Sequence, residues 1–270
     1  MKELIKNIRM SVASDKDQIL SFCKNTFSWG DYIHEVWDSW EKGDGLVIIE
    51  DHETAVAMCH GVKFQNENML WIEGIRVKEN YRKIGLATSL IRYFEKVAND
   101  FDIKRLNMLI EYENIQSLNL VKKLDYKIIS KWNYFSLPSI KNPNGEIKFE
   151  SVDISEINLK NLRFVDSWRW IPLTKDNFRN LCLSGNVLCQ KYNGVVESLG
   201  IVCESDSFDD TIILTIIFGT YDSIHKMILH VQNLSVKKGY SKIRILTEDD
   251  DLKMDSLGKK FLFYLVEKTL

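Results

Sequence analysis

The sequence has 270 residues, of which 45% are apolar and 27% are charged, the composition of a globular protein long enough for two cores. Its 36 basic residues nearly balance its 38 acidic residues, so charge gives no reason to expect nucleic acid as a partner. The amino terminus lacks the apolar run of a signal peptide, and no stretch of about 18 apolar residues follows. We therefore expect a cytoplasmic protein that does not contact a membrane.

The first half of the chain alternates short apolar runs with segments of helical periodicity. In 31–40, for example, apolar side chains recur at spacings of three and four residues, which is typical of one buried helix face. The patterns predict strands at 8–12, 46–50, 55–62, 69–77, 106–110 and 127–135, and helices from residue 14, over 31–40, over 86–101 and over 115–124.

A loop divides the chain after residue 138. Two of the three prolines, Pro138 and Pro143, lie there beside the turn at 142–145. We therefore assign one domain to residues 1–138 and another to residues 146–270. The same order of elements is then expected again: a strand at 147–152, helices from Ser155 and from Thr174, strands at 187–192, 195–204 and 211–219, a helix over 222–238, and strands at 241–248 and 261–266. This order predicts that the second domain is a diverged copy of the first.

The segment 71–96, WIEGIRVKENYRKIGLATSLIRYFEK, combines a strand, a charged connection, a glycine turn and a long helix. Its residues 82–87 spell the pattern R-x-x-G-x-[GA]. A loop that opens a helix directs backbone N–H groups and the positive end of the helix dipole toward one point. Gly85 and Ala87 are small where the backbone approaches a ligand, and Thr88 adds a hydroxyl group. The pattern predicts a pyrophosphate site, with an ordinary strand-to-helix loop as the alternative.

Two segments, IEGIRVKENYRKIGLA at 72–87 and NIQSLNLVKKLDYKII at 114–129, resemble the signatures of the GCN5-related N-acetyltransferase (GNAT) superfamily. The resemblance covers roughly residues 6–135 and implies acetyl-CoA as the co-substrate. It implies an α/β (α+β) fold of two tandem GNAT-like domains, each a mixed, mostly antiparallel twisted sheet flanked by helices. The second domain, which reads FGTYDSIHKM at the equivalent position, is expected to be a degenerate copy without the pyrophosphate loop.

The resemblance also implies where the cofactor binds. The backbone around Ile75 and Val77 is expected to accept the pantetheine arm like an added strand. Asn114 is expected to contact the pantetheine or the acetyl end. The full cofactor-binding set is Ile75, Arg76, Val77, Arg82, Lys83, Ile84, Gly85, Leu86, Ala87, Thr88, Asn114 and Ser117.

Acetyl transfer to an amine needs a base, because an ammonium group has no lone pair with which to attack. Glu73 lies four residues before Val77, where many members of the superfamily have a catalytic carboxylate. An apolar cleft would raise the pKa of such a carboxyl group toward neutrality. The alternative is a strand glutamate that faces solvent or pairs with a lysine. Cys59 has only His60 beside it, so we expect direct attack in a ternary complex and no acyl-enzyme.

The sequence departs from the family pattern at the expected general acid. Val121 stands where the pattern has a tyrosine that protonates the leaving thiolate. Tyr112 is the substitute candidate, with a core or surface tyrosine as the alternative, and an unassisted thiolate is a further alternative. Val121 also leaves open a catalytically inactive, acyl-CoA-binding regulatory or scaffolding protein.

The segment 27–40, FSWGDYIHEVWDSW, occupies the region that walls the acceptor pocket in the superfamily. Asp31, Tyr32 and Trp37 are candidates to bind a cationic amine by charge and by an aromatic face. The alternative is that the tryptophans pack in the core and Asp31 caps a helix. We expect the acceptor to be an amine of a small molecule or peptide, and the second domain to complete the acceptor cleft or to mediate homodimerisation.

No metal is expected. The five cysteines are scattered without a C-x-x-C pair, and His34, His52 and His60 lack metal-ligand spacing.

Overall fold

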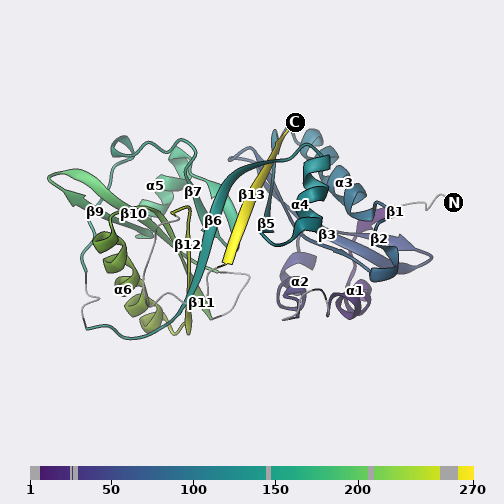
Figure 1. The fold of residues 1–270 in the computed structure, drawn as a ribbon, viewed down its shortest axis with the longest axis horizontal. Helices are drawn as coiled ribbons and strands as arrows, with labels where there is room; N and C mark the ends of the chain where they lie inside the picture. The colour runs from purple at the N-terminus through teal and green to yellow at the C-terminus, as the bar shows by residue number, and fades with distance from the viewer. Residues whose placement is uncertain (1–6, 25, 27–29, 144–146, 206–209, 250–260) are drawn as a thin grey trace. The chain divides into compact units, whose positions relative to one another are not determined.

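The chain forms two compact units in a computed structural model that describes residues 7–24, 26, 30–143, 147–205, 210–249 and 261–270 (Figure 1). The first unit comprises residues 1–129 and 265–270, and the second comprises residues 130–264. In the described part of the chain, no helix is long and apolar enough to cross a membrane.

The first unit contains a mixed, mostly antiparallel sheet in the order β1-β2-β3-β4-β5-β13. Pairs β1–β2, β2–β3 and β3–β4 are antiparallel, and β4 and β5 are parallel with α3 between them in sequence. The strands are β1 (Asn7–Met10), β2 (Leu46–Asp51), β3 (Thr54–Phe64), β4 (Met69–Val77), β5 (Arg105–Glu111) and β13 (Phe261–Thr269). The helices are α1 (Lys16–Cys23), α2 (Ile33–Glu41), α3 (Leu86–Asp100) and α4 (Ile115–Lys123), with 3₁₀ turns η1 (Ala13–Asp15) and η2 (Glu79–Tyr81).

Helices cover both faces of this sheet (Figure 1). The apolar stripe expected in 31–40 is buried in α2, and a Cβ on Gly74 of β4 would meet Trp40 of this helix at 2.5 Å. On the other face, a Cβ on Gly61 of β3 would meet Phe94 of α3 at 2.2 Å. The two glycines therefore let the helices approach the sheet from opposite sides.

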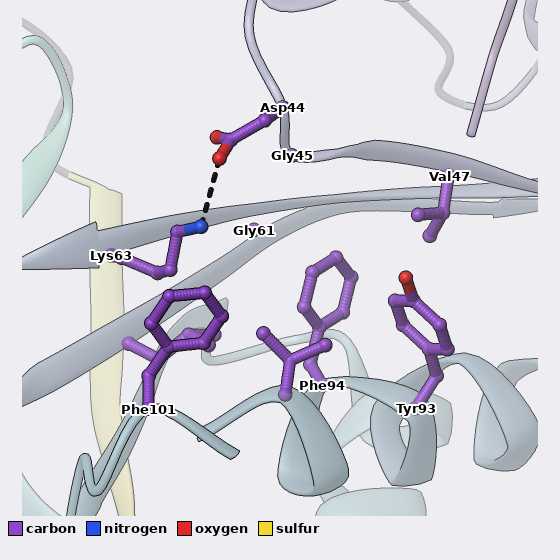
Figure 2. Close-up of a pocket in the computed structure, with 10 residues that line it drawn as sticks. Asp44, Gly45, Val47, Gly61, Lys63, Tyr93, Phe94 and Phe101 are labelled. Carbon is purple, nitrogen blue, oxygen red and sulfur yellow. Dashed lines mark hydrogen bonds and ion pairs between the residues drawn. The ribbon is translucent and has the colours of Figure 1, made fainter. Parts of the chain in front are cut away.

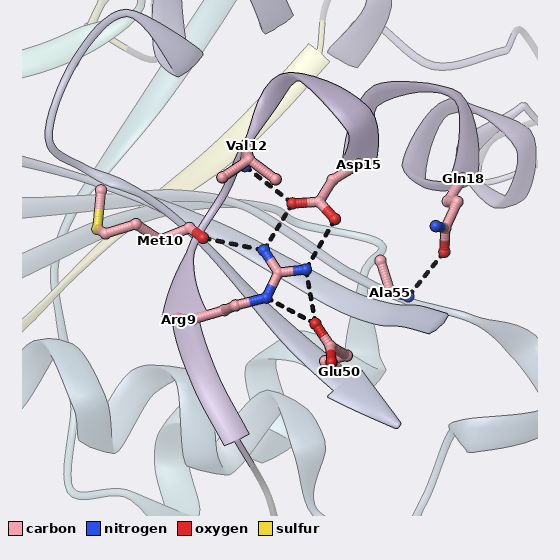
Figure 3. Close-up of polar contacts among 7 residues, drawn as sticks. All are labelled: Arg9, Met10, Val12, Asp15, Gln18, Glu50 and Ala55. Carbon is pink, nitrogen blue, oxygen red and sulfur yellow. Dashed lines mark hydrogen bonds and ion pairs between the residues drawn. The ribbon is translucent and has the colours of Figure 1, made fainter. Parts of the chain in front are cut away.

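A charge network ties the start of the unit to the sheet. The Arg9 guanidinium lies between the carboxylates of Asp15 in η1 and Glu50 in β2, at 2.8 Å and 2.6 Å (Figure 3). Asp15 also accepts a hydrogen bond from the Val12 N–H at 2.9 Å. Burial by itself raises the pKa of Asp15, but the hydrogen bonds from Arg9 and Val12 outweigh it and hold this pKa below its usual range.

The final residues of the chain complete the first unit. Asn107 of β5 donates to the Glu267 carboxylate at 3.1 Å, and Lys268 pairs with the buried carboxylate of Glu95 at 2.8 Å. Leu265 and Val266 are buried. The sequence assigns the second domain to residues 146–270, whereas the contacts return 265–270 to the first unit.

The second unit has the sheet order β6-β12-β11-β10-β9, with β9–β10, β10–β11 and β6–β12 antiparallel and β11–β12 parallel. Its core lies where Met227 and Val231 of α6 pack among Leu214, Ile216 and Ile245 of the sheet. The strands are β6 (Lys127–Pro138), β9 (Val187–Tyr192), β10 (Val195–Glu204), β11 (Thr211–Phe218) and β12 (Lys242–Thr247), and the helices are α5 (Lys175–Leu183) and α6 (Tyr221–Lys238).

The two units share an order of elements in which two antiparallel pairs precede a parallel pair that is bridged by a helix. This is the order that an internal copy predicts, while duplication itself stays a prediction.

Two predictions for the second half are wrong. Residues 147–152 are not a strand, and the helix expected from Ser155 is only the 3₁₀ turn η3 (Ile154–Glu156). Asp153 and Glu156 do form a capping box, a signal of helix starts, but the backbone is extended again at Ile157.

The chain next forms a hairpin, β7 (Arg163–Asp166) and β8 (Arg169–Pro172), that the sequence analysis missed. Its turn residues Ser167 and Trp168 have φ of +47° and +65°, a conformation usually marked in sequence by asparagine or glycine.

Candidate functional site

The parallel strands β4 and β5 pair only over their first three residues and then part from each other. They pair only where Met69–Trp71 face Arg105–Asn107, although β4 continues to Val77 and β5 to Glu111. In the second unit, by contrast, β11 and β12 pair at six positions up to Thr247, the last residue of β12. A gap between strands that could accept an extended ligand is therefore a feature of the first unit.

Strand β4 is bulged at the same level. Met58 pairs with Arg76 and His60 pairs with Glu73, so the register shifts between these two pairs. Gly74 within the bulge has φ of +65°, which a glycine adopts without strain. The bulge breaks the regular ladder at the partly exposed residue Ile75, one of the predicted cofactor contacts.

The predicted pyrophosphate loop is exposed and leads into an open helix start. Lys83 and Gly85 have φ of +65° and +90°, and Gly85 is the N-cap of α3, which receives no side-chain cap. Because the first N–H groups of a helix have no partner within it, those of α3 remain for a ligand or solvent. The equivalent start of α6 is capped by the Thr220 side chain, which accepts from the Ser223 N–H. Arg82 donates from Nε to the Val77 carbonyl at 3.2 Å.

The other predicted contacts lie beyond the end of β5. Asn114 is the N-cap of α4, and its amide oxygen accepts from the Ser117 N–H at 3.1 Å. Tyr112, the candidate acid, is exposed, whereas Val121 is buried in α4.

Glu73 lies in a small network on the α2 side of the sheet. One carboxylate oxygen is 2.8 Å from His60 Nδ1 on β3, and the other accepts from Trp71 Nε1 at 3.0 Å. Trp40 of α2 stacks on the His60 ring with centroids 4.3 Å apart and planes at 10°. Because the Glu73 side chain is 12% exposed, its carboxylate is sheltered yet reachable. The sequence analysis missed the roles of His60 and Trp71, although the pairing of the β3–β4 hairpin would have revealed the contact with His60.

The three predicted acceptor-binding residues differ in availability. Asp31 is buried, and its carboxylate receives Arg76 Nε at 2.6 Å and the Ile33 N–H at 3.1 Å. Trp37 is 1% exposed. Tyr32 is partly buried with the Arg76 guanidinium over its ring, and burial raises its pKa to about 12. Trp37 therefore packs in the core, as the alternative expects. Asp31 lies one residue before the N-cap Tyr32 of α2, where it accepts from the first N–H of the helix and from Arg76.

Cys59 is buried, and burial raises the pKa of its thiol well above the usual value. Such a thiol is a poor nucleophile at neutral pH. Among the residues with described positions, no three His, Cys, Asp or Glu side chains are grouped as metal ligands.

A cavity of about 130 Å³ lies on the other face of the sheet, between the strands and α3 (Figure 2). Tyr93 and Phe94 project into it from the helix, and Lys63 pairs with Asp44 at its edge at 2.8 Å. Gly61 lines this cavity on the side away from Trp40, so the cavity is separate from the Glu73 network.

Taken together, a parting parallel strand pair, a bulged strand and an uncapped helix behind a glycine loop are the architecture expected of an acetyltransferase. Residues 16–126 match the model of the acetyltransferase (GNAT) family. The segment 16–126 therefore matches a GNAT acetyltransferase domain, as the resemblance predicted.

Solved structures resemble nearly the whole chain. A proposed acetyltransferase from Thermoplasma acidophilum matches with a TM-score of 0.66 and 14% identity over 98% of this chain and 100% of its own. A GCN5-related N-acetyltransferase from Sphaerobacter thermophilus matches with a TM-score of 0.66 and 13% identity over 97% of this chain and 95% of its own. A proposed acetyltransferase from Pyrococcus horikoshii matches with a TM-score of 0.54 and 14% identity over 98% of this chain and 89% of its own. At these identities the likeness shows the fold alone, and no curated protein matches the sequence significantly.

Proposed function

We propose that the first unit transfers an acetyl group from acetyl-CoA to an amine of a small molecule or peptide, by direct attack in a ternary complex. The observation that carries the proposal is the parting of β4 from β5 beside the uncapped start of α3. The acetyltransferase family of residues 16–126 supports the same reaction class.

The residues present fit acetyl-CoA. The N–H groups of Leu86, Ala87 and Thr88 begin a helix without a side-chain cap, which suits a pyrophosphate. Exposed Arg82 and Lys83 add positive charge to the same loop. The backbone near Ile75 and Val77, with Asn114 and Ser117 across the gap, would hold the pantetheine arm. When bound, the cofactor supplies an acyl group activated as a thioester.

Glu73 is the proposed base. Its sheltered carboxylate stands beside the bulge, on the face covered by α2. The high pKa of Cys59 favours direct attack over an acyl-enzyme. Tyr112, exposed just beyond β5, remains the proposed acid.

For the acceptor wall, we assign direct contact to Tyr32 and a supporting role to Asp31 and Trp37. A substrate cation at Asp31 would have to displace the Arg76 guanidinium, and Trp37 has no free face to offer. Asp31 and Arg76 instead join the start of α2 to β4.

The second unit is proposed to have kept the fold without the coenzyme. Its parallel strands stay paired to the end of β12, and Thr220 occupies the head of α6. Both features remove what the first unit offers to a pantetheine and a pyrophosphate. Completion of the acceptor cleft and homodimerisation remain the two roles for this unit.

The test measures acetyl-CoA binding by calorimetry, then thiol release over a panel of free amino acids, polyamines and peptides with free amino termini. Gly85→Glu should weaken binding at least ten-fold, because it adds a negative charge and a side chain at the proposed phosphate site. Glu73→Gln should bind normally and lower kcat by roughly 100-fold or more, the range of general-base catalysis.

The matched control is Gly194→Glu, which alters another glycine with positive φ, +78°, in the second unit. It should leave acetyl-CoA binding unchanged. Binding without turnover on any amine would favour the regulatory alternative, and failure to bind acetyl-CoA would refute the proposal.

A further inference from the structure

We propose that His60 is a positioning residue for acetyl transfer, which holds the Glu73 carboxylate in its ionised, correctly oriented form. The inference rests on the proposed function of Glu73 as the base. The sequence patterns for metal ligands and for nucleophilic catalysis assign no role to this histidine.

The hydrogen bond fixes the tautomer of His60. An ionised carboxylate only accepts hydrogen bonds, so the contact of 2.8 Å between Nδ1 and Glu73 Oε1 places the proton on Nδ1. Trp71 Nε1 donates to the other oxygen at 3.0 Å. The two donors, His60 and Trp71, thus each hold one oxygen of the Glu73 carboxylate.

The imidazole is itself held firmly. His60 is 5% exposed, and the Trp40 ring lies parallel to it with centroids 4.3 Å apart. At the other ring nitrogen, a Cβ on Gly45 would lie 3.2 Å from His60 Nε2, so the glycine leaves room for the imidazole. A side chain packed this way can fix the carboxylate that it contacts.

Several titratable or charged groups lie near the pair of Glu73 and His60. Glu73 is within electrostatic reach of Tyr32 at the start of α2 and of Cys59 on β3, and both have raised pKa values, chiefly through burial. Arg76 on β4 acts on the same two groups and is paired with Asp31. His60 contacts Glu73 directly and also lies near Asp44, whose pKa is lowered mainly by the hydrogen bond from Lys63. Hence His60 is a direct hydrogen-bond donor to Glu73, while the nearby positive charge of Arg76 is already paired.

Two variants separate the hydrogen bond from the packing. His60→Phe keeps an aromatic ring against Trp40 and removes the donor. His60→Asn retains an amide N–H near the position of Nδ1. With the best acceptor of the amine panel, His60→Phe should lower kcat by roughly 10- to 100-fold, as expected for one hydrogen bond to a charged group.

In His60→Phe, the KM for acetyl-CoA should stay unchanged, and the acidic limb of the pH–rate profile should move to higher pH, because a carboxylate without this donor ionises less readily. His60→Asn should restore most of the rate. In a Glu73→Gln background, His60→Phe should cause no further loss, since the imidazole acts through the carboxylate.

The positioning role would be overturned if His60→Phe lowered kcat equally in the wild-type and Glu73→Gln backgrounds. It would also be overturned if His60→Asn did not restore the rate. A measurement that needs no turnover is the ¹⁵N spectrum of the imidazole, in which the Nδ1–H tautomer is expected. An Nε2–H tautomer would also overturn the proposal. Absence of turnover with every amine, together with the Nδ1–H tautomer, would instead refute the proposed function of Glu73 and leave the His60 contact established.

Discussion

Gly74→Ala tests whether the bulge of β4 depends on the close approach of Trp40. Gly74 has φ of +65°, and a left-handed conformation costs a residue with a Cβ roughly 1–2 kcal/mol. The new methyl group would also lie 2.5 Å from Trp40 Cζ3, with Ile33 behind it at 3.5 Å. Overpacking of this kind costs about 1–3 kcal/mol, so a total of roughly 2–5 kcal/mol is expected.

Gly194→Ala is the matched control, because Gly194 has φ of +78° and a Cβ there would meet nothing within 4 Å. Gly194→Ala should therefore lower the free energy of unfolding only by the cost of the left-handed backbone conformation, roughly 1–2 kcal/mol. Hydrogen exchange of peptides from β3–β4 and from β9–β10 would report each unit separately, since one unfolding transition is not assured for two units.

Gly74→Ala should also lower acetyl transfer, because Trp40 cannot move without releasing the His60 ring that stacks on it. A Gly74 variant no less stable than the Gly194 variant, or one with unchanged kcat, would refute this reasoning.

Two further predictions concern the stability of the first unit. Asp15→Asn should cost roughly 1–3 kcal/mol near pH 7, because it leaves the Arg9 guanidinium short of a buried partner, while Asp38→Asn at an exposed pair should destabilise the protein much less. The native pKa of Asp15 lies below that of an unfolded chain, near 3.9, so its stabilisation is complete above about pH 5 and is lost as the pH falls through the native pKa. In urea titrations at decreasing pH, the difference in stability between Asp15→Asn and wild type should therefore shrink below about pH 4. Lys268→Met should destabilise the first unit by roughly 1–3 kcal/mol, seen as faster hydrogen exchange in α3, because the buried Glu95 carboxylate loses one of its partners; unchanged exchange would show that the last strand does not stabilise this unit.

Local patterns predicted the elements that carry the proposed site. The strand over 69–77 and the helix from residue 86 follow from apolar periodicity, and Gly85 marks the left-handed residue between them. These features depend on neighbours in sequence, which is why one chain was sufficient to find them.

The same local patterns do not predict which residues that are distant in sequence contact each other. The partner of Asp31 is Arg76, and no local rule links a residue before α2 to the end of β4. The segment 261–266 reads as a strand, but its periodicity does not say which sheet it joins, and residues 265–270 belong to the first unit. The β7–β8 hairpin was missed because its turn uses serine and tryptophan at positive φ.

The contrast between the two units explains why the proposed chemistry is assigned to one of them. Both have a parallel strand pair bridged by a long helix, so the topology alone does not create a coenzyme site. The units differ in whether the backbone N–H and C=O groups of the parallel strands and of the helix start have hydrogen-bond partners within the protein. In the second unit the β11–β12 ladder and the Thr220 hydroxyl satisfy them, whereas in the first unit the ladder stops at Trp71 and Gly85 brings no side chain. Because polar backbone groups near a protein interior need partners, the first unit gains most from an extended, phosphate-bearing ligand.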